Sequence, residues 1–213
     1  MILTPISEAA LPAALGRLSS SLDREEARRV FSRIARPADA PRAAGVLAAA
    51  HWQRATAVAG ACGIALRLGS PALDFSWNGD VLRADTEAYV LLHEIAHFQL
   101  AAPARRRLVD FGLGAGPETG DRETADRAAC LFGIAREREE AMASLLGILW
   151  EVELGQPALA SFLDQNWLEG AGNPGAARHF EAILAALRGG GFIDAEFRPT
   201  RRLREAPDTL ASA

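Results

Sequence analysis

The chain has 213 residues, of which 49% are hydrophobic and 23% are charged, and its formal net charge is −4. This length is sufficient for a domain with a buried core. The acidic balance argues against a general binder of nucleic acid or of membrane surfaces, because such proteins carry clustered basic residues. No apolar run approaches the roughly 20 residues that cross a bilayer. We therefore expect no membrane association and no direct nucleic-acid partner.

The cysteines and the first residues bear on the cellular compartment. Cys62 and Cys130 lie far apart in the sequence, and we expect both to be reduced, buried thiols. The opening segment, MILTPISEAA, has no basic stretch followed by an apolar one, so it does not resemble a secretion signal. These features predict a cytoplasmic protein.

The first part of the chain predicts helices followed by a short strand element. Residues 1–60 show helical spacing of their apolar side chains. Apolar and polar residues then alternate over 65–68 and 73–77, and a turn is expected at Asn78 and Gly79. Alternation beside an Asn-Gly turn favours an antiparallel hairpin.

Two later segments predict the helices that matter for function. Residues 86–101 are strongly apolar, and Pro103 marks the end of this helix or a kink in it. Residues 137–154 form a second helical pattern. A further helix follows, and the chain after residue 195 is a polar tail. We expect the functional site in a cleft between the two helices.

The first of these helices contains the pattern His-Glu-x-x-His at residues 93–97. On a helix, His93 and His97 lie on one face about one turn apart, where two imidazoles can hold one divalent metal ion. Glu94 beside them can act as a base. The alternative is an ordinary helix that happens to carry two histidines. The apolar surroundings favour the metal, because buried imidazoles need polar partners.

Two histidines do not complete a metal site, and the third protein ligand is commonly a carboxylate. The helix at 137–154 is the best source, because acidic and small residues lie near one face of it, with Gly147 between them. We expect Glu140 as the third ligand, Glu137 as the next choice and Glu139 as the least favoured. The alternative is that these glutamates form a solvated face.

Three consecutive arginines, residues 105–107, follow the motif helix, and Asp110 comes shortly after them. One interpretation is a solvated turn in which one arginine pairs with Asp110. The other is a basic rim that receives an acidic substrate or partner.

The stretch HEIAHFQLAAPARRRLVDFG, residues 93–112, joins the histidine motif to an aromatic residue, a small-residue segment, paired arginines and Asp-Phe-Gly. In these features it resembles the core of the bacterial elongation factor P hydroxylase family. That family also has a glutamate that opens a helix running to Gly-x-Pro, and a later Asn-Leu-Glu-Gly; here Glu140 to Pro157 and NWLEG at 166–170 are similar. The resemblance covers about residues 80–170.

The resemblance implies a 2-His-1-carboxylate centre, with iron(II), that activates dioxygen and hydroxylates a modified lysine side chain of elongation factor P. Carried over by position, the metal ligands are His93, His97 and Glu140. The substrate-binding residues are Arg105, Arg106 and Asp110, of which the two arginines shape the substrate's approach or brace Asp110. After Gly112 the family continues with aromatic residues and a Pro-Asp-Gly-Arg turn, whereas this chain has LGAGPETGDR. The substrate therefore stays open.

Two other functions compete with the hydroxylase. In a zinc metallopeptidase, Glu94 is the general base and Glu140 the third zinc ligand. In a non-catalytic interaction protein, the metal is structural and the arginine rim docks a partner.

The expected fold is α+β and predominantly helical, with a zincin-like helix bearing the histidines and a small antiparallel strand element. We divide the chain into an N-terminal helical segment at 1–60, a metal-binding catalytic domain at 61–195 and a polar tail at 196–213. No oligomeric state is predicted.

Overall fold

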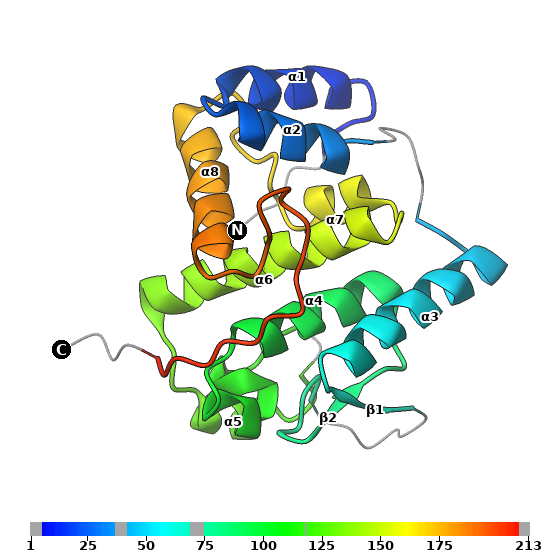
Figure 1. Ribbon diagram of the computed structural model, residues 1–213, viewed down its shortest axis with the longest axis vertical. Coiled ribbons are helices and arrows are strands. Elements are labelled where there is room, and N and C mark those ends of the chain that lie inside the picture. The colour runs from blue at the N-terminus through cyan, green and yellow to red at the C-terminus, as the bar shows by residue number, and fades with distance from the viewer. Residues whose placement is uncertain (1–5, 37–41, 69–74, 118, 209–213) are drawn as a thin grey trace.

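The computed structural model describes residues 6–36, 42–68, 75–117 and 119–208. Within these ranges the chain is predominantly helical, with eight α-helices, two short 3-10 helices and one two-stranded sheet (Figure 1). In chain order the elements are α1 (Leu11–Ser21), α2 (Glu25–Ile34), α3 (Gly45–Ala61), β1 (Ala65–Arg67), β2 (Val81–Arg83), α4 (Ala88–Leu100), η1 (Arg105–Arg107), η2 (Val109–Gly112), α5 (Arg122–Ala128), α6 (Gly133–Glu153), α7 (Ala158–Asp164) and α8 (Pro174–Gly189). None of the helices so described is long and apolar enough to cross a membrane.

The strand element is real, but the prediction that it is antiparallel is wrong. Strands β1 and β2 pair in parallel, with Leu66 opposite Leu82. The expected turn does form, since the Asn78 side-chain oxygen accepts from the backbone nitrogens of residues 80 and 81. That turn joins β2 to the segment before it, in an antiparallel bridge between Trp77 and Leu82. Strand β1 reaches β2 by a longer crossover, as parallel strands require. Residues 73 and 74 of the expected hairpin lie outside the described residues.

Helix α6 passes through the middle of the fold. Helices α1, α2, α7 and α8 lie on one side of it, and α4, α3 and the sheet lie on the other (Figure 1). Leu145, Leu146, Ile148 and Leu149 of α6 are fully buried, and they share the core with fully buried side chains of α4 such as Leu92 and Ile95. Burial of each such side chain stabilises the fold by roughly 1.5–3 kcal/mol. The core thus holds α4 and α6 side by side.

The bounds of α4 and α6 are close to those predicted, whereas the burial of the cysteines is predicted correctly for only one of them. Helix α4 begins at Ala88 and ends at Leu100, within the predicted segment and ahead of Pro103, and α6 begins four residues earlier than predicted, at Gly133. Both cysteines are free, but the prediction that both are buried is wrong for Cys130, which is exposed. The reason is that the chain between α5 and α6 runs over the surface, where the neighbouring Phe132 is also exposed.

Candidate metal centre

Helices α4 and α6 approach each other closely at Gly147. A Cβ atom added to Gly147 would lie 3.1 Å from the Cα atom of His93 and 3.3 Å from its backbone nitrogen. A glycine therefore permits an approach that a side chain would obstruct. Glu140 lies seven residues before Gly147, which is about two helical turns, so it projects from the same face of α6. The close approach places Glu140 opposite the histidines of α4.

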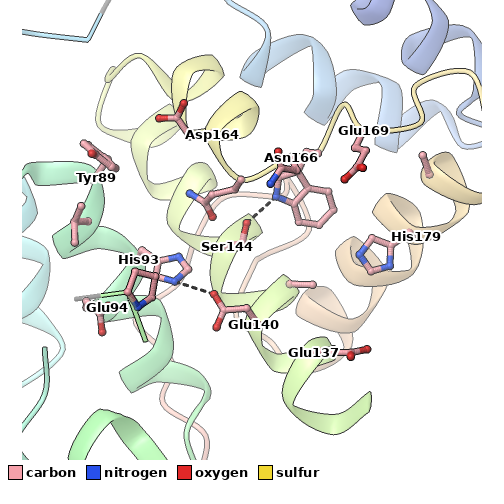
Figure 2. A pocket seen from close by; sticks show the side chains of 16 residues that line it. Tyr89, His93, Glu94, Glu137, Glu140, Ser144, Asp164, Asn166, Glu169 and His179 are labelled. Atoms are coloured by element: carbon pink, nitrogen blue, oxygen red, sulfur yellow. Dashed lines mark hydrogen bonds and ion pairs between the residues drawn. The ribbon is translucent and has the colours of Figure 1, made fainter. Parts of the chain in front are cut away.

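Three side chains meet between the two helices. The carboxylate oxygens of Glu140 lie 3.2 Å from Nε2 of His93 and 3.3 Å from Nε2 of His97. The two Nε2 atoms are 3.1 Å apart. Figure 2 shows the Glu140 carboxylate directed from α6 toward His93 on α4. We refer to His93, His97 and Glu140 as the triad, and it is a group whose ligand atoms all lie within 4.8 Å of one another.

The triad has the dimensions of a metal site. Nitrogen and oxygen ligands about 2.1 Å from one ion, at angles between those of an octahedron and a tetrahedron, lie about 3.0–3.4 Å from each other. The three separations measured in the triad fall in this range. Two imidazoles and a carboxylate are ligands that both iron(II) and zinc(II) accept. The residues therefore fit a divalent metal ion.

Aromatic rings cover the buried side of His97. The Phe111 ring stacks on the His97 imidazole with centroids 5.9 Å apart, and the Trp77 ring stacks on Phe111 at 5.5 Å. The Nδ1 atoms of His93 and His97 are buried and have no hydrogen-bond partner in the described part of the chain. Both imidazoles therefore make their polar contacts through Nε2, inside the triad.

Electrostatics couple His97 to Glu140. Burial works against a charged ring, but the nearby Glu140 carboxylate outweighs it and raises the pKa of His97 to about 9. Burial likewise works against a charged carboxylate, but His97 and His93 hold the pKa of Glu140 far below its ordinary value. Without a metal, the buried His97 ring and the half-exposed Glu140 carboxylate thus form an ion pair at neutral pH. A bound metal ion replaces the proton of His97.

The metal-free protein is expected to lose stability as the pH rises from about 6.5 to about 9. The pKa of His97 is raised from 6.5 to about 9 on folding, so its stabilising effect is complete below pH 6.5 and disappears as the pH passes 9. The loss is at most about 3 kcal/mol. Urea unfolding in a chelator, at about pH 6 and about pH 9.5, measures this difference. His97→Gln should remove it, and equal wild-type stabilities at both pH values would contradict the ion pair.

A cavity of about 720 Å³ opens beside the triad, with His93 and Glu140 in its lining. Figure 2 shows that its other walls come from α8, which carries His179, and from the segment after α7. We call this the outer cavity. The carboxylate side chains that line it are Glu94, Glu137, Glu140, Asp164 and Glu169, and no arginine lines it within the described ranges. The outer cavity is therefore an acidic environment.

The charge of the outer cavity is only partly compensated. Asp164 pairs with Arg42, whereas Glu137 and Glu169 have no ion-pair partner among the residues that the structure describes. An aromatic surface accompanies them, because the Trp167 ring stacks on His179 at 5.5 Å. The Trp167 indole nitrogen donates to the Ser144 hydroxyl on α6 at 2.7 Å, which fixes the ring against the wall.

A second, inner cavity of about 80 Å³ also borders the triad and is lined by His97, Glu94 and Asp110 among others. Burial raises the pKa of Glu94, against the opposing effect of His97 and His93. Burial also raises the pKa of Asp110, although hydrogen bonds from Thr119 and from the backbone work against it. Glu94 thus lines both cavities next to the histidines of the triad, in a position that suits a general base.

The inner cavity is shaped by a strained turn. Asp110 and Phe111 have φ angles of 42° and 56°, in the left-handed region that non-glycine residues rarely adopt. Thr119 donates to the Asp110 carboxylate at 2.6 Å, and the Asp110 backbone nitrogen donates to the Trp77 carbonyl at 2.8 Å. Arg105 donates to the Phe111 carbonyl at 2.9 Å. These contacts hold Phe111 over His97.

The arginines that follow the motif helix lie elsewhere. Arg105 is 2% exposed and pairs with Glu139 and Asp208. Arg106 donates to backbone carbonyls, including that of Ala101 at 3.1 Å. Neither lines the outer or the inner cavity. An arginine pair with Asp110 is not among their contacts, so that interpretation is wrong, whereas Asp110 itself does reach the site.

The outer cavity is also lined by residues whose place in the site the sequence barely indicates. His179 stands alone in a helical segment, a pattern typical of a packing or surface residue. Trp167 and Glu169 belong to the stretch NWLEG, whose likeness to the hydroxylase family is the one indication of a role. The three come together because α6 packs against both α7 and α8, and no local pattern encodes that arrangement.

No protein-family model, curated protein sequence or solved structure matches this chain. The class of protein is therefore defined by its fold and site: a predominantly helical chain that brings two histidines and a glutamate together beside an acidic cavity.

Proposed function

We propose that the chain is a metal-dependent hydroxylase, similar to elongation factor P hydroxylase, that acts in the cytoplasm on a positively charged, modified lysine side chain of a protein. The observation that supports this best is the position of the triad beside a cavity with unpaired carboxylates. The proposed metal is iron(II), and the proposed protein substrate is elongation factor P.

The roles of the residues follow from their positions. His93, His97 and Glu140 would hold the metal ion, which when bound supplies the activation of dioxygen. Phe111 and Trp77 exclude water from the buried side of His97. The overall reaction inserts one oxygen atom of dioxygen into a C–H bond and releases the other as water, so it consumes two electrons and two protons from an external reductant.

The outer cavity suits a cationic side chain. Glu137 and Glu169 offer negative charge, and the face of Trp167 offers a surface on which an ammonium group can lie. Each carboxylate is expected to contribute about 1 kcal/mol to binding, or about fivefold in KM. Because Arg105 and Arg106 do not line this cavity, they enter the proposal as bracing residues, while Asp110 lines the inner cavity.

The proposal is tested by metal analysis followed by mass spectrometry. Protein purified without added metal should contain iron, and in air with a reductant it should add one oxygen atom to elongation factor P that carries its modified lysine. Glu137→Gln should raise KM about fivefold with little change in kcat. Glu123→Gln, at an exposed position on α5, is the matched control. Iron-loaded protein that leaves the substrate's mass unchanged would overturn the proposed reaction.

A zinc metallopeptidase is the second candidate, because Glu94 has the position of a general base. It lines both cavities beside the histidines, and burial raises its pKa toward the range in which a carboxylate works as a base. His179 in the outer cavity is a possible donor to a reacting carbonyl. Zinc in the purified protein, with peptide cleavage that Glu94→Gln abolishes, would establish this function in place of the hydroxylase.

A structural metal in a non-catalytic interaction protein receives less support. Structural zinc sites have four protein ligands as a rule, whereas the triad supplies three from the described residues. The same metal analysis, with neither oxidation nor hydrolysis, would favour this alternative.

A further inference from the structure

A C-terminal segment, residues 199–208, runs along helix α4 on the side away from the triad. We call this segment the strap. The Gln99 side-chain nitrogen donates to two strap carbonyls at 2.7 and 3.1 Å, and the Arg204 backbone nitrogen donates to the Gln99 carbonyl at 2.8 Å. Gln99 is fully buried and accepts from the Trp150 indole of α6 at 3.0 Å. The strap is thus tied to α4 directly and to α6 through Gln99. Figure 1 shows it in red, running past α4 toward the C-terminus.

The strap lies on the side of α4 away from the metal ligands. Gln99 follows His97 by two residues, and on an α-helix two residues correspond to a rotation of about 200°, so the two side chains leave from nearly opposite faces. The strap therefore cannot contact a substrate in the outer cavity. Any effect it has on the triad must pass through the positions of α4, α6 and the turn at Asp110.

Arg105 connects the strap to the triad's surroundings. Its guanidinium donates to the Asp208 carboxylate of the strap at 2.6 Å, to the Phe111 carbonyl at 2.9 Å, and to the Glu139 carboxylate. The side chains of Arg105 and Glu139 are 3% and 7% exposed. Arg204 of the strap adds a second positive charge, 3.2 Å from Asp208. The two arginines and the two carboxylates of this network balance in charge.

Two of the Arg105 contacts end next to the triad. Glu139 immediately precedes Glu140, so an ion pair at Glu139 constrains the rotation of α6 at the point where Glu140 faces the histidines. Phe111 stacks on the His97 ring, so the hydrogen bond from Arg105 to the Phe111 carbonyl fixes the residue that packs against His97. Arginine suits this task because its planar group donates in several fixed directions at once. A lysine offers only a single nitrogen.

We propose that Arg105, oriented by Asp208 of the strap, is a positioning residue that holds Glu140 and His97 in the geometry that binds the metal ion. The inference rests on the proposed metal centre but not on the reaction or the substrate. It assigns a function to the polar tail of the chain and to one of the arginines after the motif helix.

Cobalt(II) binding to the full-length, metal-free protein tests this proposal, because the visible spectrum of the ion reports its ligands and titration gives its affinity. Asp208→Asn removes the charge that orients Arg105 and keeps the size of the side chain. We expect its cobalt(II) affinity to fall about tenfold, as when a residue that supports metal ligands is changed. Arg105→Lys should have at least the same effect, with an altered spectrum in both variants.

Glu123→Gln is the matched control, because it breaks the exposed pair between Glu123 and Arg127 and should leave affinity and spectrum unchanged. Wild-type affinity in both Asp208→Asn and Arg105→Lys, even with a lowered melting temperature, would show that the network is merely structural and would overturn the proposal. No cobalt(II) binding by the wild-type protein would overturn the metal centre itself, and this inference with it.

Discussion

His97→Ala is expected to abolish metal binding. The substitution removes the most buried side chain of the triad and leaves one imidazole and one carboxylate, too few to hold an ion against water. Because changes to residues outside the coordination sphere already cost about 10–100-fold in affinity, the loss of a ligand should exceed about 100-fold. Elemental analysis of the purified variant and titration with cobalt(II) both measure the effect.

His179→Ala is the control for this prediction, because it removes a histidine from the same cavity without touching the triad. Full metal occupancy in His97→Ala would refute the site. A parallel comparison identifies the third ligand: Glu140→Ala should lose most of the metal and Glu137→Ala should retain it, since only Glu140 contacts both imidazoles.

Gly147→Val is expected to destabilise the fold and weaken metal binding together. Even the first carbon of the new side chain would lie 3.1 Å from the His93 Cα atom, and the backbone of a buried helix cannot easily withdraw. Overpacking of this kind costs about 1–3 kcal/mol. Since the two helices carry all three residues of the triad, their separation should also move Glu140 away from the imidazoles. Urea denaturation measures the first effect and cobalt(II) titration the second.

Gly60→Val provides the comparison for this variant, because Gly60 lies in helix α3 and an added Cβ atom would meet nothing within 4 Å. Valine is slightly more favourable than glycine within a helix, so Gly60→Val should preserve stability and metal affinity. Unchanged affinity in Gly147→Val would mean that the close approach of α4 and α6 does not position the ligands.

Much of the site could be predicted from local patterns. A spacing of four residues places His93 and His97 on one helical face wherever the helix lies. The acidic stretch at 137–140 marks α6 as the source of a carboxylate. Which of the three glutamates in this stretch faces the histidines depends on how α6 is rotated about its axis. The fold directs Glu140 at the histidines and Glu139 at Arg105, so two adjacent residues have different partners.

Other features could not be predicted because they depend on distant segments. The turn at Asn78 could be predicted from its residues. The parallel pairing of β2 with β1 could not, because it depends on how the chain between the two strands crosses over. The direction of Arg105 depends on the buried carboxylate of Glu139 and on the half-buried carboxylate of Asp208, about one hundred residues later. Without such partners, an arginine after a helix is expected on the surface, because an unpaired buried charge is costly.

Local patterns are enough to predict a predominantly helical protein in which two histidines and Glu94 share one helix, because helical periodicity and residue spacing are local properties. The contact of Glu140 with the histidines, the acidic cavity beside them and the placement of Arg105 and Arg106 away from that cavity arise only when the helices pack. These outcomes depend on the packing of α6 against α4 through Gly147 and on charges that are paired across the fold, which no short stretch of sequence contains.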